Sequence, residues 1–201
     1  MKKSVSKLLA AAAIAFAFAA CQDKTNPTPP PIPTPTPTPD DTLVCVVNLD
    51  LQVSEGIGDI FTIKKGEYTL GQDITFNFAE LLTFTSGWSV SNNRADVPCV
   101  STFVMDFAEN TGFEPVKDSA YNITLDYSYA VSIINQNGKI FDSVNLRDGI
   151  GIKGINIAEA IKQLGRNGFY KMVTDALNVN YKVTANADGS LTVKDLRNPA
   201  E

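Results

Sequence analysis

The residues best suited to chemistry in this sequence are its three cysteines, at positions 21, 45 and 99. Histidine is absent from the chain, which removes the most frequent general base, the usual zinc ligand and the partner of a catalytic serine or cysteine. Catalysis by carboxylates alone stays open, but the adjacent acids Asp40 and Asp41 follow a proline-rich run and suggest no catalytic pair. The sequence therefore points to no catalytic residue, metal ligand or cofactor, and it leaves the question of an enzyme open while favouring a non-enzyme.

Two short motifs match known binding loops in spacing only. The run Gly149-Ile-Gly-Ile-Lys-Gly154 has the glycine spacing of a dinucleotide-binding loop. Its neighbours indicate antiparallel hairpins rather than a βαβ unit, so we interpret the run as a flexible loop between a strand and a helix. Residues 186–193 are similar to a calcium loop, but Thr184 stands where the first carboxylate is needed. A hairpin turn accounts for the same residues.

Trp88 is the single tryptophan of the chain, and it precedes a polar stretch at residues 91–96. An exposed indole is a stacking surface for a sugar or a peptide. A lone tryptophan more often belongs to a hydrophobic core. We therefore expect Trp88 to be buried, with a ligand contact as the alternative.

The first twenty residues have the features of an export signal. Residues 1–7 hold three lysines and no acid, and residues 8–20 form an apolar run that is too short for a permanent membrane span. The run ends in Phe18-Ala19-Ala20-Cys21, which resembles the lipobox of bacterial lipoproteins of the Bacteroidota type. The resemblance implies that residues 1–20 are a signal peptide and that Cys21 is acylated as the first residue of the mature chain. It also implies that lipid anchors the chain in the membrane.

Residues 21–41 are predicted to be a lipidated N-terminus followed by a disordered Pro/Thr-rich tether. Eight of the chain's 11 prolines fall within residues 26–39. Proline fixes φ and lacks a donor, which favours an extended polyproline helix that reaches roughly 40 Å over this segment. Gln22 is compatible with an outer membrane lipoprotein, but the weak acidic signal Asp23-Lys24 leaves the periplasmic and cell-surface faces open.

The charge of the chain excludes one class of partner. The whole chain carries a net charge of -5, and removal of residues 1–20 takes away three lysines and no acid, which brings the mature chain to -8. So acidic a protein repels nucleic acid, and the sequence has no basic cluster for phosphate contacts. We therefore expect no nucleic-acid partner.

Export also bears on the two remaining cysteines. Oxidising compartments favour disulfides, and acylation of Cys21 leaves an even number of thiols. Cys45 shares an apolar strand face with Val47 and Leu49, and Cys99 opens an apolar stretch after Val97-Pro98. We predict a disulfide between Cys45 and Cys99. The alternative is a pair of separate buried thiols.

Three triplets have the form Asp, then Ser or Thr, then an apolar residue, which Bacteroidota O-glycosylate on exported proteins. They place candidate glycosylation sites at Thr42, Ser119 and Ser143. The alternative is that all three are ordinary polar residues of loops and strands.

Residues 42–201 are predicted to form a single globular β-rich domain. Alternating polarity predicts strands at 43–53, 74–78, 102–107, 122–133 and 139–146, with the Asn137-Gly138 turn between the last two. A hairpin is expected over 60–70 with its turn at 64–67, helices are expected from a cap at Asn156 and over 169–177 with a break at 165–168, and a final hairpin over 179–193. The fold class is α+β and β-dominated: an antiparallel sandwich or curled sheet with a short C-terminal helical region followed by a β-hairpin.

Taken together, these features predict a membrane-anchored protein of the cell envelope that serves as a non-catalytic binding or interaction module. Its expected partner is an envelope glycan or protein. The alternatives are an adhesin-like or structural subunit of a surface assembly, whose sheet accepts a neighbour's strand, and a carboxylate-dependent glycan hydrolase.

Overall fold

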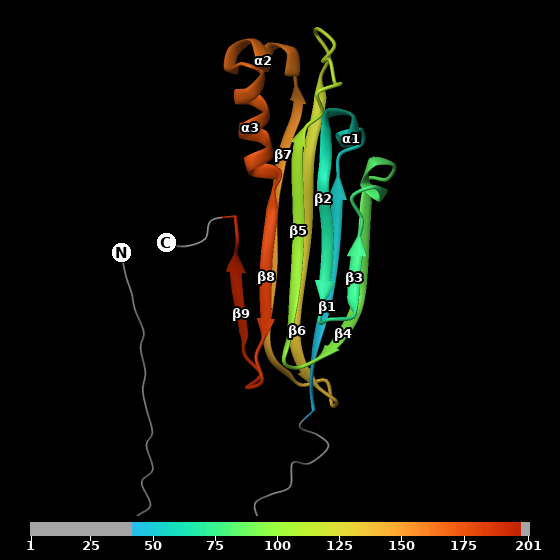
Figure 1. The fold of residues 1–201 in the computed structure, drawn as a ribbon, viewed down its shortest axis with the longest axis vertical. Helices are drawn as coiled ribbons and strands as arrows, with labels where there is room; N and C mark the ends of the chain where they lie inside the picture. Colours follow the sequence, from blue (N-terminus) through green and yellow to red (C-terminus); the bar gives the residue numbers. More distant parts are fainter. Residues whose placement is uncertain (1–41, 198–201) are drawn as a thin grey trace, which may run out of the picture. The chain divides into compact units, whose positions relative to one another are not determined.

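Two antiparallel β-sheets pack face to face around one core in the computed structural model, which describes residues 42–197 apart from the side chain of Asp148 (Figure 1). Cys21, the signal peptide and the tether lie outside the described residues. The first sheet has the order β4 (Gly87–Asp96), β1 (Leu43–Val53), β6 (Tyr121–Asn135), β7 (Ile140–Ile155). The second has the order β3 (Ile74–Asn77), β2 (Phe61–Leu70), β5 (Cys99–Glu109), β8 (Val179–Ala185), β9 (Leu191–Asp195). The helices are α1 (Ile57–Ile60), the 3-10 turn η2 (Leu81–Thr83), α2 (Ile157–Leu164) and α3 (Arg166–Leu177). The predicted β-dominated, antiparallel sandwich is confirmed.

Alternating apolar residues create the core. In β1 the buried side chains Val47, Leu49 and Leu51 share the face that meets the second sheet, and every residue of β1 is paired with β6. In the second sheet, β5 and β8 bury alternate residues in the same way. Because the side chains of a strand alternate between its two faces, each sheet presents one apolar face to the other.

The two ends of the sandwich differ. Strand β1 begins at Leu43, and the β4–β5, β6–β7 and β8–β9 turns lie at this same end, which we call the Leu43 end (Figure 1). The opposite end carries α1, α2 and the loop of residues 110–120, and we call it the helical end. Helix α3 packs against β5 and buries Phe169, Tyr170, Val173 and Leu177.

The hairpin predicted over residues 60–70 is wrong, because β2 runs without interruption from Phe61 to Leu70. Its pairing with β5 shifts register between Ile63 and Lys65, which marks a β-bulge. The residue after the bulge is Gly66, and a glycine is required there because a Cβ atom would lie 2.9 Å from the ring of Phe78. The glycine signals the close approach of Phe78 rather than a turn.

The flexible loop predicted at the glycine motif is also wrong, because Gly149, Gly151 and Gly154 all lie in β7. A side chain at Gly149 would lie 2.6 Å from Oδ1 of Asp126 in the neighbouring β6. Gly154 has φ +66, and its N–H donates to Oδ1 of Asn122 at 3.0 Å. Gly149 and Gly154 therefore serve the pairing of β6 with β7, and the three glycines form no phosphate-binding turn before a helix.

The helix cap predicted at Asn156 is confirmed, because its side chain accepts a hydrogen bond of 3.0 Å from the backbone N–H of Glu159. The predicted break at 165–168 is reduced to Gly165, and α3 begins at Arg166. The guanidinium of Arg166 pairs with Glu109 and donates to the carbonyl of Phe113, which fixes the first turn of α3.

Replacing the capping residue is expected to destabilise the fold modestly. Asn156→Ala leaves one backbone N–H of α2 without its partner and should lower the free energy of unfolding by about 1 kcal/mol. Urea denaturation followed by circular dichroism measures the loss. Asn156→Ser keeps a capping oxygen and should match the parent chain, so equal midpoints for the alanine and serine variants would contradict the capping role.

The predicted order of a helical region and a hairpin near the C-terminus is matched only roughly. Helices α2 and α3 do precede β8 and β9, but β8 also pairs with β5 over Cys99 to Met105. The two strands are therefore the outer part of the five-stranded sheet rather than a separate hairpin. Two short helical segments that the sequence pattern did not predict, α1 and η2, lie outside this region.

Candidate functional site

Cys45 and Cys99 are brought together from opposite sheets at the Leu43 end. Cys45 lies in β1 and is 1% exposed, whereas Cys99 is the first residue of β5 and is half-buried. The chain crosses from the first sheet to the second through Val97 and Pro98, between β4 and β5. The two thiols are free, and they are close enough to influence each other's ionisation. The structure thus makes the two cysteines neighbours, and the disulfide between them stays a prediction.

The contact makes the two thiols unequal. The hydrogen bond from the Cys45 thiol lowers the pKa of Cys99, although burial and the negative charge of Asp96 act in the opposite direction. The same hydrogen bond, together with burial, raises the pKa of Cys45. Cys99 is therefore the sulfur that ionises first, and the thiolate is the reactive form of cysteine.

A group of hydroxyls lies behind the thiols in the core. The Tyr129 hydroxyl donates to Ser101 Oγ at 2.6 Å, and Ser101 Oγ donates to the Thr69 carbonyl at 2.8 Å. Burial raises the pKa of Tyr68 to about 12. The Tyr68 hydroxyl and Nδ2 of Asn93 are buried near each other but make no hydrogen bond of ordinary geometry within residues 42–197. Burial therefore raises the pKa of Tyr68 and Tyr129 further above physiological pH, whereas the Ser101 hydroxyl acts in the opposite direction.

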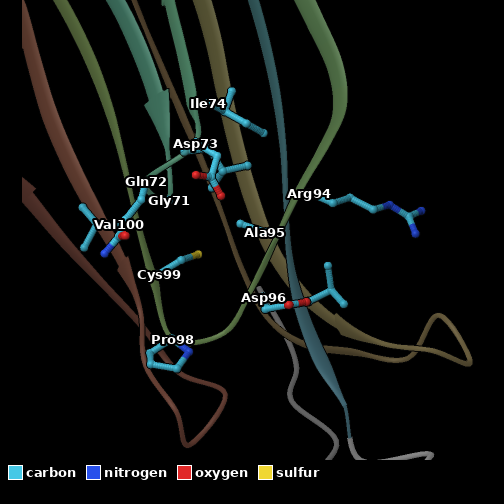
Figure 2. Close-up of a pocket in the computed structure, with 12 residues that line it drawn as sticks. Gly71, Gln72, Asp73, Ile74, Arg94, Ala95, Asp96, Pro98, Cys99 and Val100 are labelled. Carbon is cyan, nitrogen blue, oxygen red and sulfur yellow. The ribbon is translucent and has the colours of Figure 1, made fainter.

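A cavity of about 630 Å³ opens beside Cys99, and Figure 2 shows the residues around it. One wall is the β2–β3 turn with Gly71, Gln72 and Asp73, and the other is the last part of β4 with Ala95 and Asp96. Cys99 lines this cavity, whereas Cys45 does not. The volume falls within the range of small-molecule sites, so a small ligand can reach one sulfur of the pair.

A second cleft, of about 530 Å³, lies at the helical end. Its aromatic part is Phe113 and Tyr121, whose rings meet edge to face with centroids 5.6 Å apart. Its polar part comes from three separate segments and comprises Ser54, Glu55, Asp59, Asn122, Thr124 and Lys153. Sequence reasoning missed this cleft because its residues share no motif. The only local signal was the loop at residues 110–120, which lacks periodicity.

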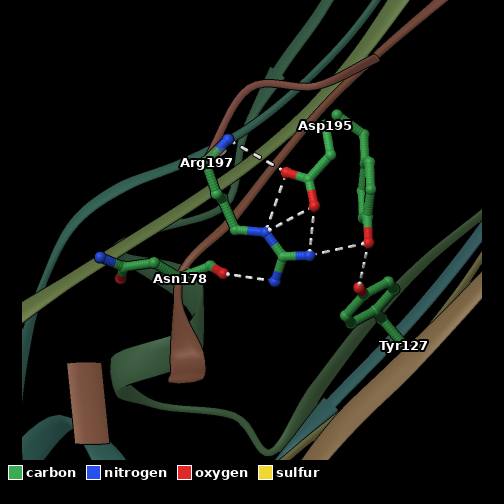
Figure 3. Close-up of polar contacts among 5 residues, drawn as sticks. Tyr127, Asn178, Asp195 and Arg197 are labelled. Carbon is green, nitrogen blue, oxygen red and sulfur yellow. Dashed lines mark hydrogen bonds and ion pairs between the residues drawn. The ribbon is translucent and has the colours of Figure 1, made fainter. Parts of the chain in front are cut away.

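Arg197 follows β9 and is the centre of a polar network, which Figure 3 shows. Its guanidinium donates to Asp195 Oδ2 at 2.6 Å, to the Tyr181 hydroxyl at 3.0 Å and to the Asn178 carbonyl at 3.1 Å. The Tyr127 hydroxyl of the first sheet donates to Tyr181 at 3.2 Å. The network joins the two sheets, and its donors and acceptors are largely occupied by one another, which indicates a structural role.

The Arg197–Asp195 pair predicts a specific pH dependence. The guanidinium holds the pKa of Asp195 below its ordinary value, so the stabilisation is present above about pH 4 and is lost as the pH falls through the lowered pKa. Asp195→Asn should cost about 1 kcal/mol at pH 7, and the difference from the parent chain should shrink in acid. Urea titrations at several pH values measure this. Asp175→Asn, which breaks only the exposed pair with Lys171, should change little, and a constant Asp195→Asn deficit down to pH 2 would contradict the ion pair.

Trp88 is half-buried, so the expectation of a buried indole holds only in part. Its ring stacks on Phe78 with centroids 4.7 Å apart, and Phe76 and Tyr68 lie at 5.9 and 6.3 Å. The indole points inward, like its pairing partner Leu51, but β4 is an edge strand and leaves one side of the ring open. The aromatic rings therefore cover the core at the edge between the two sheets. A ligand contact at Trp88 stays a prediction.

The three candidate glycosylation sites differ in their surroundings. Thr42 and Ser143 are exposed, whereas Ser119 is half-buried in the loop at residues 110–120. The carboxylate of Asp142, which precedes Ser143, accepts from the N–H of Leu191 at 2.8 Å and so ties β7 to β9. The aspartate of that triplet thus has a structural task of its own, and glycosylation at all three positions stays a prediction.

Three further observations concern the part of the chain that the structure describes. The turn predicted at Asn186–Gly189 is present, and Asp188 accepts from Ser190 there. No cluster of three or more histidine, cysteine or acidic side chains able to hold a metal occurs within residues 42–197. None of the helices among these residues has the length and apolar character needed to cross a membrane.

Comparison with protein-family models, with curated proteins and with solved structures finds no match to the chain.

Proposed function

We propose that this chain is a lipid-anchored protein of the bacterial outer membrane whose β-sandwich is a non-catalytic binding module for an envelope glycan or peptide. The signal peptide, Cys21 and the tether are the sequence features that support the anchor. The observation that carries the binding function is the mixed aromatic and polar cleft at the helical end. The face of the membrane on which the domain acts is left open.

The cleft lies at the helical end of the domain, and the first residue of β1 lies at the opposite, Leu43 end. Leu43 is where the tether joins the domain, and β1 runs from there to Val53 over 11 residues. At about 3.3 Å per residue this separates the attachment point from the cleft by roughly 35 Å. The cleft and the first residue of β1 therefore lie at opposite ends of the sandwich.

The chemistry of the cleft suits a ligand with hydroxyl or amide groups. Phe113 and Tyr121 offer aromatic surface to a sugar ring or a peptide side chain, and Asn122 and Thr124 bring side-chain hydrogen-bonding groups. Glu55, Asp59 and Lys153 add charge of both signs to the rim. Clefts that join aromatic faces to a few polar groups are typical ligand sites.

The anchor is tested by Cys21→Ala. The substitution removes the acylated sulfur, so the protein is expected to leave the membrane fraction and to lose incorporation of labelled fatty acid. Fractionation of cells that express either form measures the change. Continued membrane association and labelling of the alanine variant would contradict the anchor.

Binding is tested with the full-length protein against peptidoglycan fragments, envelope polysaccharides and peptides of envelope proteins. The double variant Glu55→Ala, Lys153→Ala changes two exposed rim residues and should weaken binding about tenfold or more, equal to about 1.4 kcal/mol. The matched control is Glu80→Ala, Lys194→Ala, which changes exposed residues outside the cleft and should bind normally. Equal loss in both variants would contradict the cleft, and release of shortened glycans by the parent chain would favour a hydrolase.

A further inference from the structure

The two sulfurs of the Leu43 end differ in access. Cys99 is half-buried and lines the 630 Å³ cavity between the β2–β3 turn and β4. Cys45 is 1% exposed and lies behind Cys99, toward the core. A molecule that enters the cavity therefore reaches Cys99 first.

The surroundings of Cys99 support reactivity rather than simple burial. The charged residues that line the cavity are Asp73, Arg94 and Asp96, and Figure 2 shows Arg94 directed away from Cys99. No lysine or arginine therefore pairs with the sulfur in the described chain. The stabilising partner of a Cys99 thiolate is instead the Cys45 thiol, which donates to it. An adjacent thiol that stabilises a thiolate also stands in position to displace a leaving group from it.

We propose that Cys99 and Cys45 form a thiol–disulfide exchange site that reacts with low-molecular-weight disulfides and thiols entering the cavity. Cys99 is the attacking sulfur, and Cys45 is the resolving sulfur. The site is independent of the binding cleft, which lies at the other end of the sandwich. The proposal goes beyond a static cross-link, because it assigns a direction of attack and a class of reaction partner.

The exchange proceeds in two displacements. The Cys99 thiolate attacks one sulfur of a small disulfide, the S–S bond of that molecule breaks, and one thiolate leaves while Cys99 holds a mixed disulfide. Cys45 then gives its proton to the departed thiolate and attacks the Cys99 sulfur, which expels the second thiolate. The protein loses two electrons and the small disulfide gains them, and the product is the Cys45–Cys99 bond. An external thiol that attacks the bond at Cys99 runs the sequence in reverse.

Trapping with oxidised glutathione tests the assignment. The full-length chain is reduced, freed of reductant and exposed to oxidised glutathione, and each cysteine peptide is identified by mass spectrometry, with the Cys21 peptide followed separately. Cys45→Ser should retain glutathione on Cys99, because no resolving thiol is present. Cys99→Ser should acquire glutathione on Cys45 at least about tenfold more slowly, because that sulfur is buried. The parent chain should release glutathione and form the Cys45–Cys99 bond.

A second measurement uses the parent chain alone and does not depend on how the variants fold. Limiting iodoacetamide added to the reduced protein should alkylate Cys99 before Cys45. Circular dichroism and the emission of Trp88 establish that each variant is folded. Equal reaction rates of the two sulfurs in folded protein, or the absence of a mixed disulfide in folded Cys45→Ser, would overturn the proposal.

Discussion

Oxidation of the Cys45–Cys99 pair is expected to raise the free energy of unfolding by about 4 kcal/mol relative to the reduced chain. The bond would close a loop with 53 residues between the two cysteines, and it would remove the corresponding chain entropy from the unfolded state. The two thiols, which come from different sheets, are already neighbours, and this favours the bond. For a domain whose net stability is about 5–15 kcal/mol, this is a large share.

Guanidinium denaturation of the oxidised and the reduced protein measures the difference. Thiol counting on the denatured, unreduced chain establishes the redox state of each sample. The matched control is Cys45→Ala, Cys99→Ala, which should show the same midpoint with and without reductant. Two free thiols in protein isolated from the envelope would reject the disulfide in the cell, and equal midpoints for the oxidised and reduced chain would reject its stabilising role.

Phe103→Ala is expected to lower the free energy of unfolding by about 3–5 kcal/mol. Phe103 is 0% exposed at the centre of β5, and its ring lies 5.3 and 5.6 Å from the rings of Tyr127 and Tyr129 in the facing sheet. A third ring, of Phe78, lies at 6.3 Å. The deletion therefore leaves a cavity at the point where the two sheets meet.

The comparison that isolates this effect uses Phe84, which is 87% exposed. Phe84→Ala removes the same atoms from the surface and should change the stability by less than about 0.5 kcal/mol. Phe103→Leu fills part of the cavity and should fall between the parent chain and Phe103→Ala. Similar losses in Phe84→Ala and Phe103→Ala, measured by urea denaturation, would contradict the assignment of the core.

Regular alternation made the central strands predictable from the sequence. Strand β1 has the predicted limits, Leu43 and Val53, because every second side chain faces the core. The cap at Asn156 was predictable for a similar reason, since the residues that make it are three positions apart. The pairing of Cys45 with Cys99 was predicted from the chemistry of exported proteins. That argument did not indicate which sheets hold the two cysteines, or that a cavity lies beside Cys99.

The failures have a shared cause in contacts between distant segments. Gly66 reads locally as a turn residue, but the ring of Phe78 decides its role. Gly149 belongs to a motif of spaced glycines, but Asp126 and the backbone of β6 decide its role. The cleft at the helical end combines Glu55, Tyr121 and Lys153, which no pattern within a single window connects. Local patterns fix which residues face inward, and the pairing of remote strands fixes the site.

The strand order leaves the first strand of the domain without its partners until later strands are available. Strand β1 pairs with β4 and β6, and its residue Leu43 meets Asn135. If the chain is exported with its N-terminus first, as the proposed signal peptide implies, β1 crosses the membrane long before residue 135. Because such non-local pairings slow folding and leave strand edges open to aggregation, we expect the first strand to depend on a holding chaperone in the envelope until β6 arrives. Under this proposal, folding of the domain is coupled to the completion of export.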